Sequence, residues 1–176
     1  MSVFNPPDKI LYSDFGGDWP KFCDALYSKF KQDFVNSKPK IPNRRVGLKA
    51  HPMIQNKEAT FWHFISEGKN EEDRLPDIPR SEFLPWIRPM IELYGATNLK
   101  VWSKRHKGNE VRVLIAIEDF SYLIVLADRG EYVLPWTAYP IIFESQRNKY
   151  KREFEDFKKK LGAHSSYDPF TPSTTG

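Results

Sequence analysis

A histidine set among aromatic residues is the first feature of this sequence that could carry chemistry. His63 lies in the run FWHF (61–64), within a segment that has the apolar spacing of a short helix. Partial burial beside aromatic rings holds an imidazole neutral with a pKa near the working pH, which suits general acid–base catalysis. A core or surface histidine bonded to a backbone carbonyl gives the same pattern. Taken alone, this segment favours the structural role.

Three arginines along a proline-braced segment are the second such feature. Arg74, Arg80 and Arg88 occur in DRLPDIPRSEFLPWIRP (73–89), with Trp86 close to the last of them. A guanidinium group binds phosphate through two donors and stabilises the charge that develops in phosphoryl chemistry. An Arg–Glu network that ties the loop to the next helix is the alternative, and this segment alone favours it.

A strand-like segment further along the chain is the third. In LPWTAYPI (134–141), Thr137 and Tyr139 are two positions apart, so in a strand their side chains share one face and Trp136 points to the other. Hydroxyl groups on a sheet can position a scissile phosphate. Threonine and tyrosine are also ordinary strand residues, so the segment is consistent with a strand that has no chemical role.

The N-terminal half predicts helices that would position these residues. An extended arm over residues 1–18 precedes an amphipathic helix to about Val35, with apolar residues at a spacing of four. Asn56 is expected to cap a helix over residues 57–67. Ser81 is expected to cap the helix that follows the arginine-rich loop.

The C-terminal half predicts a sheet followed by a helix. Short segments rich in Val, Ile, Leu and Tyr occur at residues 99–103, 110–117, 121–127 and 131–142. Their tight turns are typical of an antiparallel meander. An apolar stripe predicts a long helix over residues 144–161, and residues 162–176 are expected to form a flexible tail. The predicted fold class is therefore α+β, with N-terminal helices packed on a four-stranded antiparallel meander and a long C-terminal helix, in one domain over residues 1–161.

The composition favours a packed domain with a basic surface. Of 176 residues, 40% are hydrophobic and 15% are aromatic, which is enough material for a core. Lys and Arg number 27 against 23 for Asp and Glu, and the net charge of +4 suits a polyanionic partner without requiring one. The most basic stretch, residues 37–50, contains Lys49 and no acid. A solvated loop and a polyanion contact are both open there.

Several kinds of site are not indicated. The single cysteine, Cys23, rules out an intrachain disulfide and a cysteine-rich zinc site. The four histidines are far apart in the sequence, and there is no glycine-rich phosphate loop. We therefore expect no metal and no cofactor. The sequence has no secretory leader pattern and no run of 18 apolar residues, which predicts a cytoplasmic protein without a membrane span.

In this order, the three segments resemble the barnase/EndoU/colicin/RelE-like nuclease superfamily, and its phage-associated and toxin members in particular. The resemblance covers about residues 46–142, with an aromatic-His helix, an arginine-rich linker and a four-stranded antiparallel sheet whose last strand reads Thr-Ala-Tyr-Pro. It implies metal-independent cleavage of RNA. In that reaction the 2′-hydroxyl attacks the adjacent phosphate and gives a cyclic phosphate and a free 5′-hydroxyl.

The resemblance also implies roles for individual residues. His63 matches the general acid or base, and Arg80 or Arg88 matches the group on the transition-state phosphate. Thr137 and Tyr139 match the polar pair of the last strand. The expected RNA contacts are further basic and aromatic side chains: Lys49, His51, Arg74, Trp86, Trp102 and Lys104.

Two functions follow from these features. The first is a ribonuclease, a toxin or phage-related effector, with RNA and an acidic neutralising protein as its partners. The second is a non-catalytic binding module for nucleic acid or protein, which explains the aromatic and basic content equally well. The two functions predict different surroundings for His63. A catalytic histidine faces a groove shared with Thr137 and with Arg80 or Arg88, whereas a structural histidine faces the core.

Overall fold

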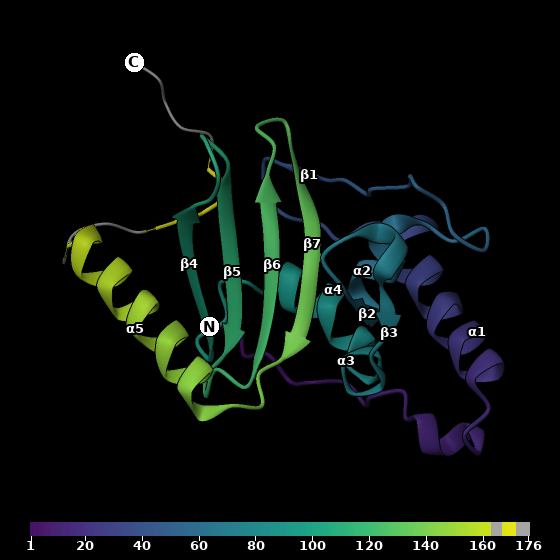
Figure 1. The fold of residues 1–176 in the computed structure, drawn as a ribbon. Helices are drawn as coiled ribbons and strands as arrows, with labels where there is room; N and C mark the ends of the chain where they lie inside the picture. Colours follow the sequence, from purple (N-terminus) through teal and green to yellow (C-terminus); the bar gives the residue numbers. More distant parts are fainter. Residues whose placement is uncertain (163–166, 172–176) are drawn as a thin grey trace.

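The computed structural model describes residues 1–162 and 167–171, which form the α+β arrangement of Figure 1. Its elements follow in the order η1 (Tyr12–Phe15, a 3₁₀ turn), α1 (Trp19–Phe30), η2 (Lys31–Val35, a π-helical turn), β1 (Arg45–Val46), α2 (Ala59–Ile65), β2 (Ser66–Glu67), η3 (Glu71–Asp73, a 3₁₀ turn), β3 (Leu75–Pro76), α3 (Ile78–Glu82), α4 (Leu84–Glu92), β4 (Leu99–Arg105), β5 (Val111–Ile117), β6 (Tyr122–Asp128), β7 (Tyr132–Pro140) and α5 (Glu144–Leu161). The predicted C-terminal helix is confirmed as α5.

The main sheet has five strands in the order β1-β7-β6-β5-β4. Strands β4 to β7 are antiparallel neighbours, but β1 pairs with β7 in parallel, with Arg45 opposite Tyr132 and Val46 opposite Val133. The backbone N–H of Gly47 adds a bond of 2.8 Å to the carbonyl of Val133. The prediction of a four-stranded antiparallel meander is therefore wrong, because two residues from the basic connector extend the sheet into a mixed one.

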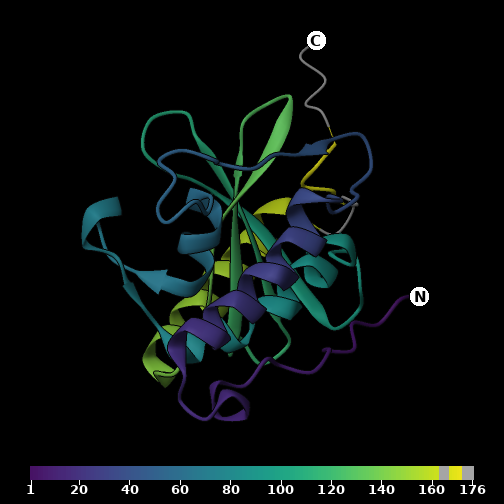
Figure 2. The same ribbon diagram turned by 90° about the vertical axis from the view of Figure 1, so that its right-hand side faces the viewer.

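Helices cover the two faces of this sheet unequally. The larger core lies on one face, where α1 and α4 pack with strand residues such as Ile115 and Ile124. In Figure 2, α1 lies nearest the viewer, outside α2 and the β7 edge. On the opposite face α5 packs along β4 and buries Trp102 and Phe154. Figure 1 shows α5 at the β4 side of the sheet.

The helix with the FWHF run is shorter than predicted. It begins at Ala59, whose backbone N–H donates to the carbonyl of Ala50, so the preceding loop completes its first turn. The predicted cap is wrong because Asn56 adopts a positive φ of 57° in that loop, outside the helix. The helix ends at Ile65, because the next two residues form β2 and pair with β3.

The arginine-rich segment forms β3 and two short helices. Asp77 caps α3 by accepting a hydrogen bond of 3.1 Å from the backbone N–H of Arg80. The prediction that Ser81 caps the next helix is wrong, because Ser81 lies inside α3 and the N-cap of α4 is Phe83. Pro79 lies in the first turn, where its missing N–H has no intrahelical partner to lose. Ser81 is buried inside α3 and donates to the carbonyl of Ile65 at 3.0 Å.

The N-terminal arm is held along the domain. The backbone of Phe4 makes two hydrogen bonds of 2.8 Å with the side chain of Asn98, and its ring is buried. Further along, the backbone N–H groups of Ile10 and Tyr12 donate to the carbonyl and the carboxylate of Glu82. These bonds fix the arm beside α3 and α4.

The C-terminal segment also packs on the domain where it is described. Phe170 is 1% exposed, and its ring lies edge-on against that of Tyr94, with centroids 4.7 Å apart. The flexible tail predicted over residues 162–176 is therefore wrong for residues 167–171. Residues 163–166 and 172–176 lie outside the described residues. Within the described residues, no helix has both the length and the apolar character that a membrane span needs.

Candidate functional site

α2 places His63 beside the edge of the sheet. The helix is buried along its whole length between α1 and β7. Phe61 and Phe64 pack on Phe30 of α1. The His63 ring instead lies edge-on against Trp136 of β7, with ring centroids 5.1 Å apart. The histidine therefore faces the sheet edge and not the aromatic core.

Glu71 joins His63 to Lys49. The Oε1 atom of Glu71 lies 2.8 Å from Nε2 of His63 and 2.8 Å from Nζ of Lys49. The backbone of Lys49 is fixed by Thr60, whose Oγ1 accepts from the Lys49 N–H at 2.9 Å and whose N–H donates to the Lys49 carbonyl at 3.0 Å. The second oxygen of Glu71, Oε2, is buried without a hydrogen-bond partner among the described residues.

The ionisation of this cluster makes His63 a base. Burial lowers the pKa of His63, and its hydrogen bond with Glu71 offsets only part of that effect. Burial raises the pKa of Glu71, but the hydrogen bonds from Lys49 and His63 outweigh it and the net shift is downward. At neutral pH an ionised carboxylate can only accept, so a neutral His63 donates from Nε2 and keeps Nδ1 as its acceptor.

Arg74 fixes the loop that carries Glu71. Its Nε donates to the Ser66 hydroxyl at 3.1 Å, its Nη2 to the Ser66 carbonyl at 2.8 Å and its Nη1 to the Gly68 carbonyl at 3.0 Å. Gly68 has a φ of +150°, and a Cβ there would lie 2.9 Å from the Arg74 Cα. The return of the chain over α2 therefore requires glycine at this position.

Arg80 reaches the same place from α3. Its Nη1 donates to the Ser66 carbonyl at 2.7 Å, and its guanidinium carbon lies 5.3 Å from the centroid of the Tyr139 ring. The nearest carboxylate oxygens, from Asp77 and Glu67, are looser partners at 3.7 and 3.9 Å. A guanidinium group has five N–H donors, so Arg80 keeps several donors beyond this anchor.

A pocket of about 320 Å³ brings these groups together. It is lined by His63, Glu67, Gly68, Lys69, Glu71, Arg74, Arg80, Trp136 and Thr137. Three cationic side chains face two acidic ones there, and Lys49 adds a further cation next to Glu71. The shared groove expected for a catalytic histidine, with Arg80 and Thr137, is therefore present.

A β-bulge turns Trp136 toward this pocket. In the β6–β7 ladder Val125 pairs with Thr137 and Leu126 pairs with Pro135, so Trp136 is the extra residue on β7. A bulge interrupts the alternation of side chains between the two faces of a strand. The prediction that Trp136 points away from Thr137 is therefore wrong, because both line the same pocket.

Thr137 and Tyr139 line two neighbouring hollows. The Oγ1 atom of Thr137 lies 3.5 Å from the carbonyl oxygen of His63. The hydroxyl of Tyr139 lies 2.7 Å from that of Tyr150 on α5, and both tyrosines line a second hollow. Trp136 lines both the first pocket and this hollow, so the two are neighbours.

Arg88 lines neither the His63 pocket nor the second hollow. Its guanidinium on α4 donates to the carbonyls of Asp33 and Lys38, to the Ser37 hydroxyl and to the Glu92 carboxylate. These bonds tie α4 to the segment after α1. Of the two arginines predicted for the phosphate, the structure thus brings only Arg80 to His63.

Of the other predicted RNA contacts, some line a hollow and others do not. Lys104 lines the second hollow, although its ammonium also binds Glu153 of α5. Trp102 is 1% exposed beneath α5, so its ring has no free face for a base. Trp86 packs on Tyr122 and donates to the backbone of the N-terminal arm. His51 is exposed in the loop before α2 and is not among the residues that line the His63 pocket.

Sequence reasoning missed Glu71, the partner of His63. It lies in NEED (70–73), which reads as a solvated loop. The available signal was the position of three consecutive acids directly before Arg74. The place of Trp136 in this pocket was missed as well, because no local sequence pattern predicts a β-bulge.

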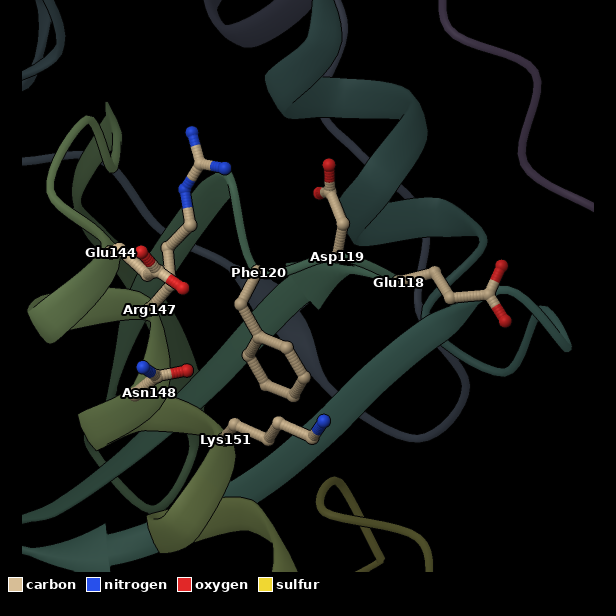
Figure 3. A pocket seen from close by; sticks show the side chains of 7 residues that line it. All are labelled: Glu118, Asp119, Phe120, Glu144, Arg147, Asn148 and Lys151. Atoms are coloured by element: carbon tan, nitrogen blue, oxygen red, sulfur yellow. The ribbon is translucent and has the colours of Figure 1, made fainter.

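A further pocket of about 350 Å³ lies between the β5–β6 turn and the first turns of α5 (Figure 3). In Figure 3, Glu118, Asp119 and Phe120 come from the turn, and the other labelled side chains come from the helix. Its lining holds three acidic and two cationic side chains and no histidine. Arg147 is anchored to the carbonyl of Ile141 at 2.8 Å. This pocket therefore lacks the base and the cationic excess of the His63 pocket.

No group of three or more His, Cys, Asp or Glu side chains in residues 1–162 and 167–171 is arranged to hold a metal ion. Comparisons with protein-family models, with curated proteins and with solved structures give no match. The resemblance to the nuclease superfamily therefore stays a prediction, and the case for a function rests on the geometry of the pocket.

Proposed function

We propose that this protein is a ribonuclease that cleaves RNA by attack of the 2′-hydroxyl on the adjacent phosphate, without a metal ion. One observation carries the proposal. His63 bonds to the ionised carboxylate of Glu71 and faces a pocket that it shares with Arg74 and Arg80. An oriented base next to fixed cations is what this reaction needs.

His63 is the general base in the proposed reaction. Its Nδ1 accepts the proton of the 2′-hydroxyl while the 2′-oxygen bonds to phosphorus and the bond from phosphorus to the 5′-oxygen breaks. The imidazolium then returns the proton to the 5′-oxygen, which gives a 2′,3′-cyclic phosphate and a 5′-hydroxyl. The carboxylate of Glu71 stabilises the imidazolium between the two transfers, since the two groups are already 2.8 Å apart.

Arg74 and Arg80 supply the positive charge for the phosphate. Both are anchored on the carbonyl of Ser66, at 2.8 and 2.7 Å, so their positions are set before substrate arrives. Fixed donors stabilise developing charge without reorganisation, and loss of one such donor costs about 10²–10³-fold in rate. Lys49 is already paired with Glu71, so the two arginines are the better candidates for this role.

The test is cleavage of mixed cellular RNA in the presence of EDTA by the wild-type protein and by His63→Asn. We expect products with cyclic phosphate ends from the wild type, and a loss of about 10²–10⁴-fold in the variant. His51→Asn is the matched control, because that histidine is exposed outside the pocket. Cleavage that persists in a folded His63→Asn protein would refute the assignment.

A non-catalytic RNA-binding module is the second candidate function. One observation favours it. Three N–H donors of Arg74 already bond to Ser66 and to the carbonyl of Gly68. In that case Arg74 and Arg80 stabilise the fold and do not act on a phosphate. RNA binding then weakens as the salt concentration rises, and no cleavage product forms. Absence of product with several RNA classes, together with salt-dependent binding, would select this function.

A further inference from the structure

The second hollow lies on the sheet face that α5 partly covers, next to Tyr150 of that helix, and measures about 230 Å³. Leu114 of β5 and Val125 of β6 contribute its apolar surface, and the rings of Tyr139 and Tyr150 lie beside them. Sites for whole small molecules usually measure about 300–1,000 Å³, so this hollow suits a single ring-sized group.

Cations accompany the aromatic rings of this hollow. The guanidinium of Arg112 lies 4.7 Å from the centroid of the Trp136 ring, and the ammonium of Lys104 lies 5.6 Å from that of Tyr150. Proteins that bind single-stranded nucleic acid combine such groups, because bases stack on planar side chains and cations bind the phosphates. The lining therefore matches a nucleotide better than an uncharged ligand.

The hollow adjoins the His63 pocket at two residues. Trp136 lines both of them. Arg80 lines the pocket, and its guanidinium lies 5.3 Å from the ring centroid of Tyr139, which lines the hollow. A phosphate bound at Arg80 would therefore have its neighbouring nucleotide next to Tyr139.

We infer that this hollow binds one unpaired nucleotide adjoining the cleaved phosphate, and that the substrate is single-stranded RNA. A base in an A-form duplex is stacked inside the helix and cannot enter a recess, whereas a base in a loop or at an end can turn outward. This inference rests on the proposed function and extends it from the chemistry to the form of the substrate.

The first test measures binding apart from cleavage. The probes are 2′-O-methyl tetrauridylate, which lacks the attacking hydroxyl, and the same tetranucleotide with abasic sites in place of its bases, with the dissociation constant measured by fluorescence anisotropy at fixed salt. We expect the tetranucleotide to bind about tenfold more tightly than its abasic form to the wild type. Tyr139→Leu and Lys104→Gln should each reduce that advantage severalfold. Lys158→Gln, which removes another cation beside an aromatic ring of α5, is the matched control and should leave it unchanged.

The second test compares cleavage of a hairpin RNA in its loop and in its stem. We expect cleavage confined to the loop. Equal cleavage of the stem, or an unchanged advantage of the tetranucleotide over its abasic form in folded Tyr139→Leu and Lys104→Gln, would overturn the inference and leave the ribonuclease standing. Competition by polyglutamate as strong as by the tetranucleotide would also overturn it, because the surface would then be a general polyanion site. A protein that shows the advantage of the bases but cleaves nothing would retain the nucleotide site and refute the ribonuclease.

Discussion

The imidazole of His63 and the carboxylate of Glu71 form a pair, with Nε2 and Oε1 2.8 Å apart. Lys49 binds the same oxygen at 2.8 Å and, together with His63, lowers the pKa of the carboxyl group. Because the carboxylate stays ionised, it selects the tautomer of His63 that has its proton on Nε2. This relationship ties the orientation, the basicity and the charge of His63 to one side chain on a separate loop.

Glu71→Gln should separate catalysis from folding. The amide no longer stabilises an imidazolium, so we expect kcat to fall by about 10²–10⁴-fold with little change in KM. Glu72→Gln is the control, since Glu72 is exposed on the same turn. Steady-state cleavage of a short RNA measures both constants. Equal kinetics in the Glu71 and Glu72 variants would mean that the carboxylate has no part in the reaction.

The pH profile of cleavage should report the lowered pKa of His63. Burial lowers this pKa from its ordinary value of 6.5, so the base is already neutral at pH 7. We expect kcat/KM to be level near neutral pH and to fall on the acid side with a midpoint below 6.5. In Glu71→Gln that midpoint should move lower still, because the hydrogen bond and negative charge that raise the pKa are gone. A midpoint above 6.5 would contradict the assignment of His63 as the base.

The same histidine should make the fold less stable in acid. Its pKa is lowered in the folded state, so as the pH falls below 6.5 the unfolded chain binds a proton that the folded chain does not. The stability from neutral His63 is thus present above 6.5 and is lost as the pH falls through the folded pKa. Urea midpoints at pH 7.5 and about 5 measure this difference, which should shrink in His63→Asn and persist in His51→Asn. Equal differences in the two variants would show that other groups cause the acid sensitivity.

Arg80 and Arg88 should respond differently to the same replacement. Lysine keeps the charge but loses the planar fork. Arg80→Lys is expected to lower kcat at least tenfold, because the phosphate loses paired donors. Arg88→Lys should instead lower the free energy of unfolding by about 1–2 kcal/mol and leave kcat unchanged, because its bonds join α4 to the segment after α1. Cleavage assays and urea melts on both variants test this contrast, and a reversed pattern would contradict the placement of the phosphate.

The C-terminal segment should contribute to stability. Phe170 is 1% exposed and packs on Tyr94, so Phe170→Ala is expected to cost about 3 kcal/mol. Thr171→Ala, at an exposed neighbouring position, is the control. Thermal unfolding of the two variants measures the difference. Matching melting temperatures would indicate that the segment is a dispensable tail.

Local patterns in the sequence were enough for the long elements of this fold. Segments rich in Val, Ile, Leu and Tyr predict β4 to β7, and the stripe of Tyr150, Phe154 and Phe157 predicts α5. The parallel pairing of β1 with β7 was not predicted, because two residues carry no periodicity and their partners lie far along the chain. Phe170 was placed in a tail for a similar reason, since one buried ring makes no repeating pattern.

The site was predicted in part. His63, Arg80 and Thr137 meet in one pocket, as the order of the motifs indicated. Arg88 does not, because α4 turns it toward the carbonyls after α1, a direction that depends on how α4 packs. Glu71 and Trp136 depend on a loop closure and on a bulge, and both are tertiary features that residue spacing does not encode.

The His63 pocket can form only after β7, the last strand of the sheet, has been synthesised. The carbonyl of His63 and the hydroxyl of Thr137, on opposite walls, are 74 positions apart in the sequence. Ribosomes add about 5–20 residues per second, so a nascent chain carries His63 for roughly 4–15 s before Thr137 is made. Until β7 follows, α2 has no sheet edge to lie against and Trp136 is absent. Chains released before this strand therefore hold the base without its pocket, and synthesis itself delays the assembly of the site.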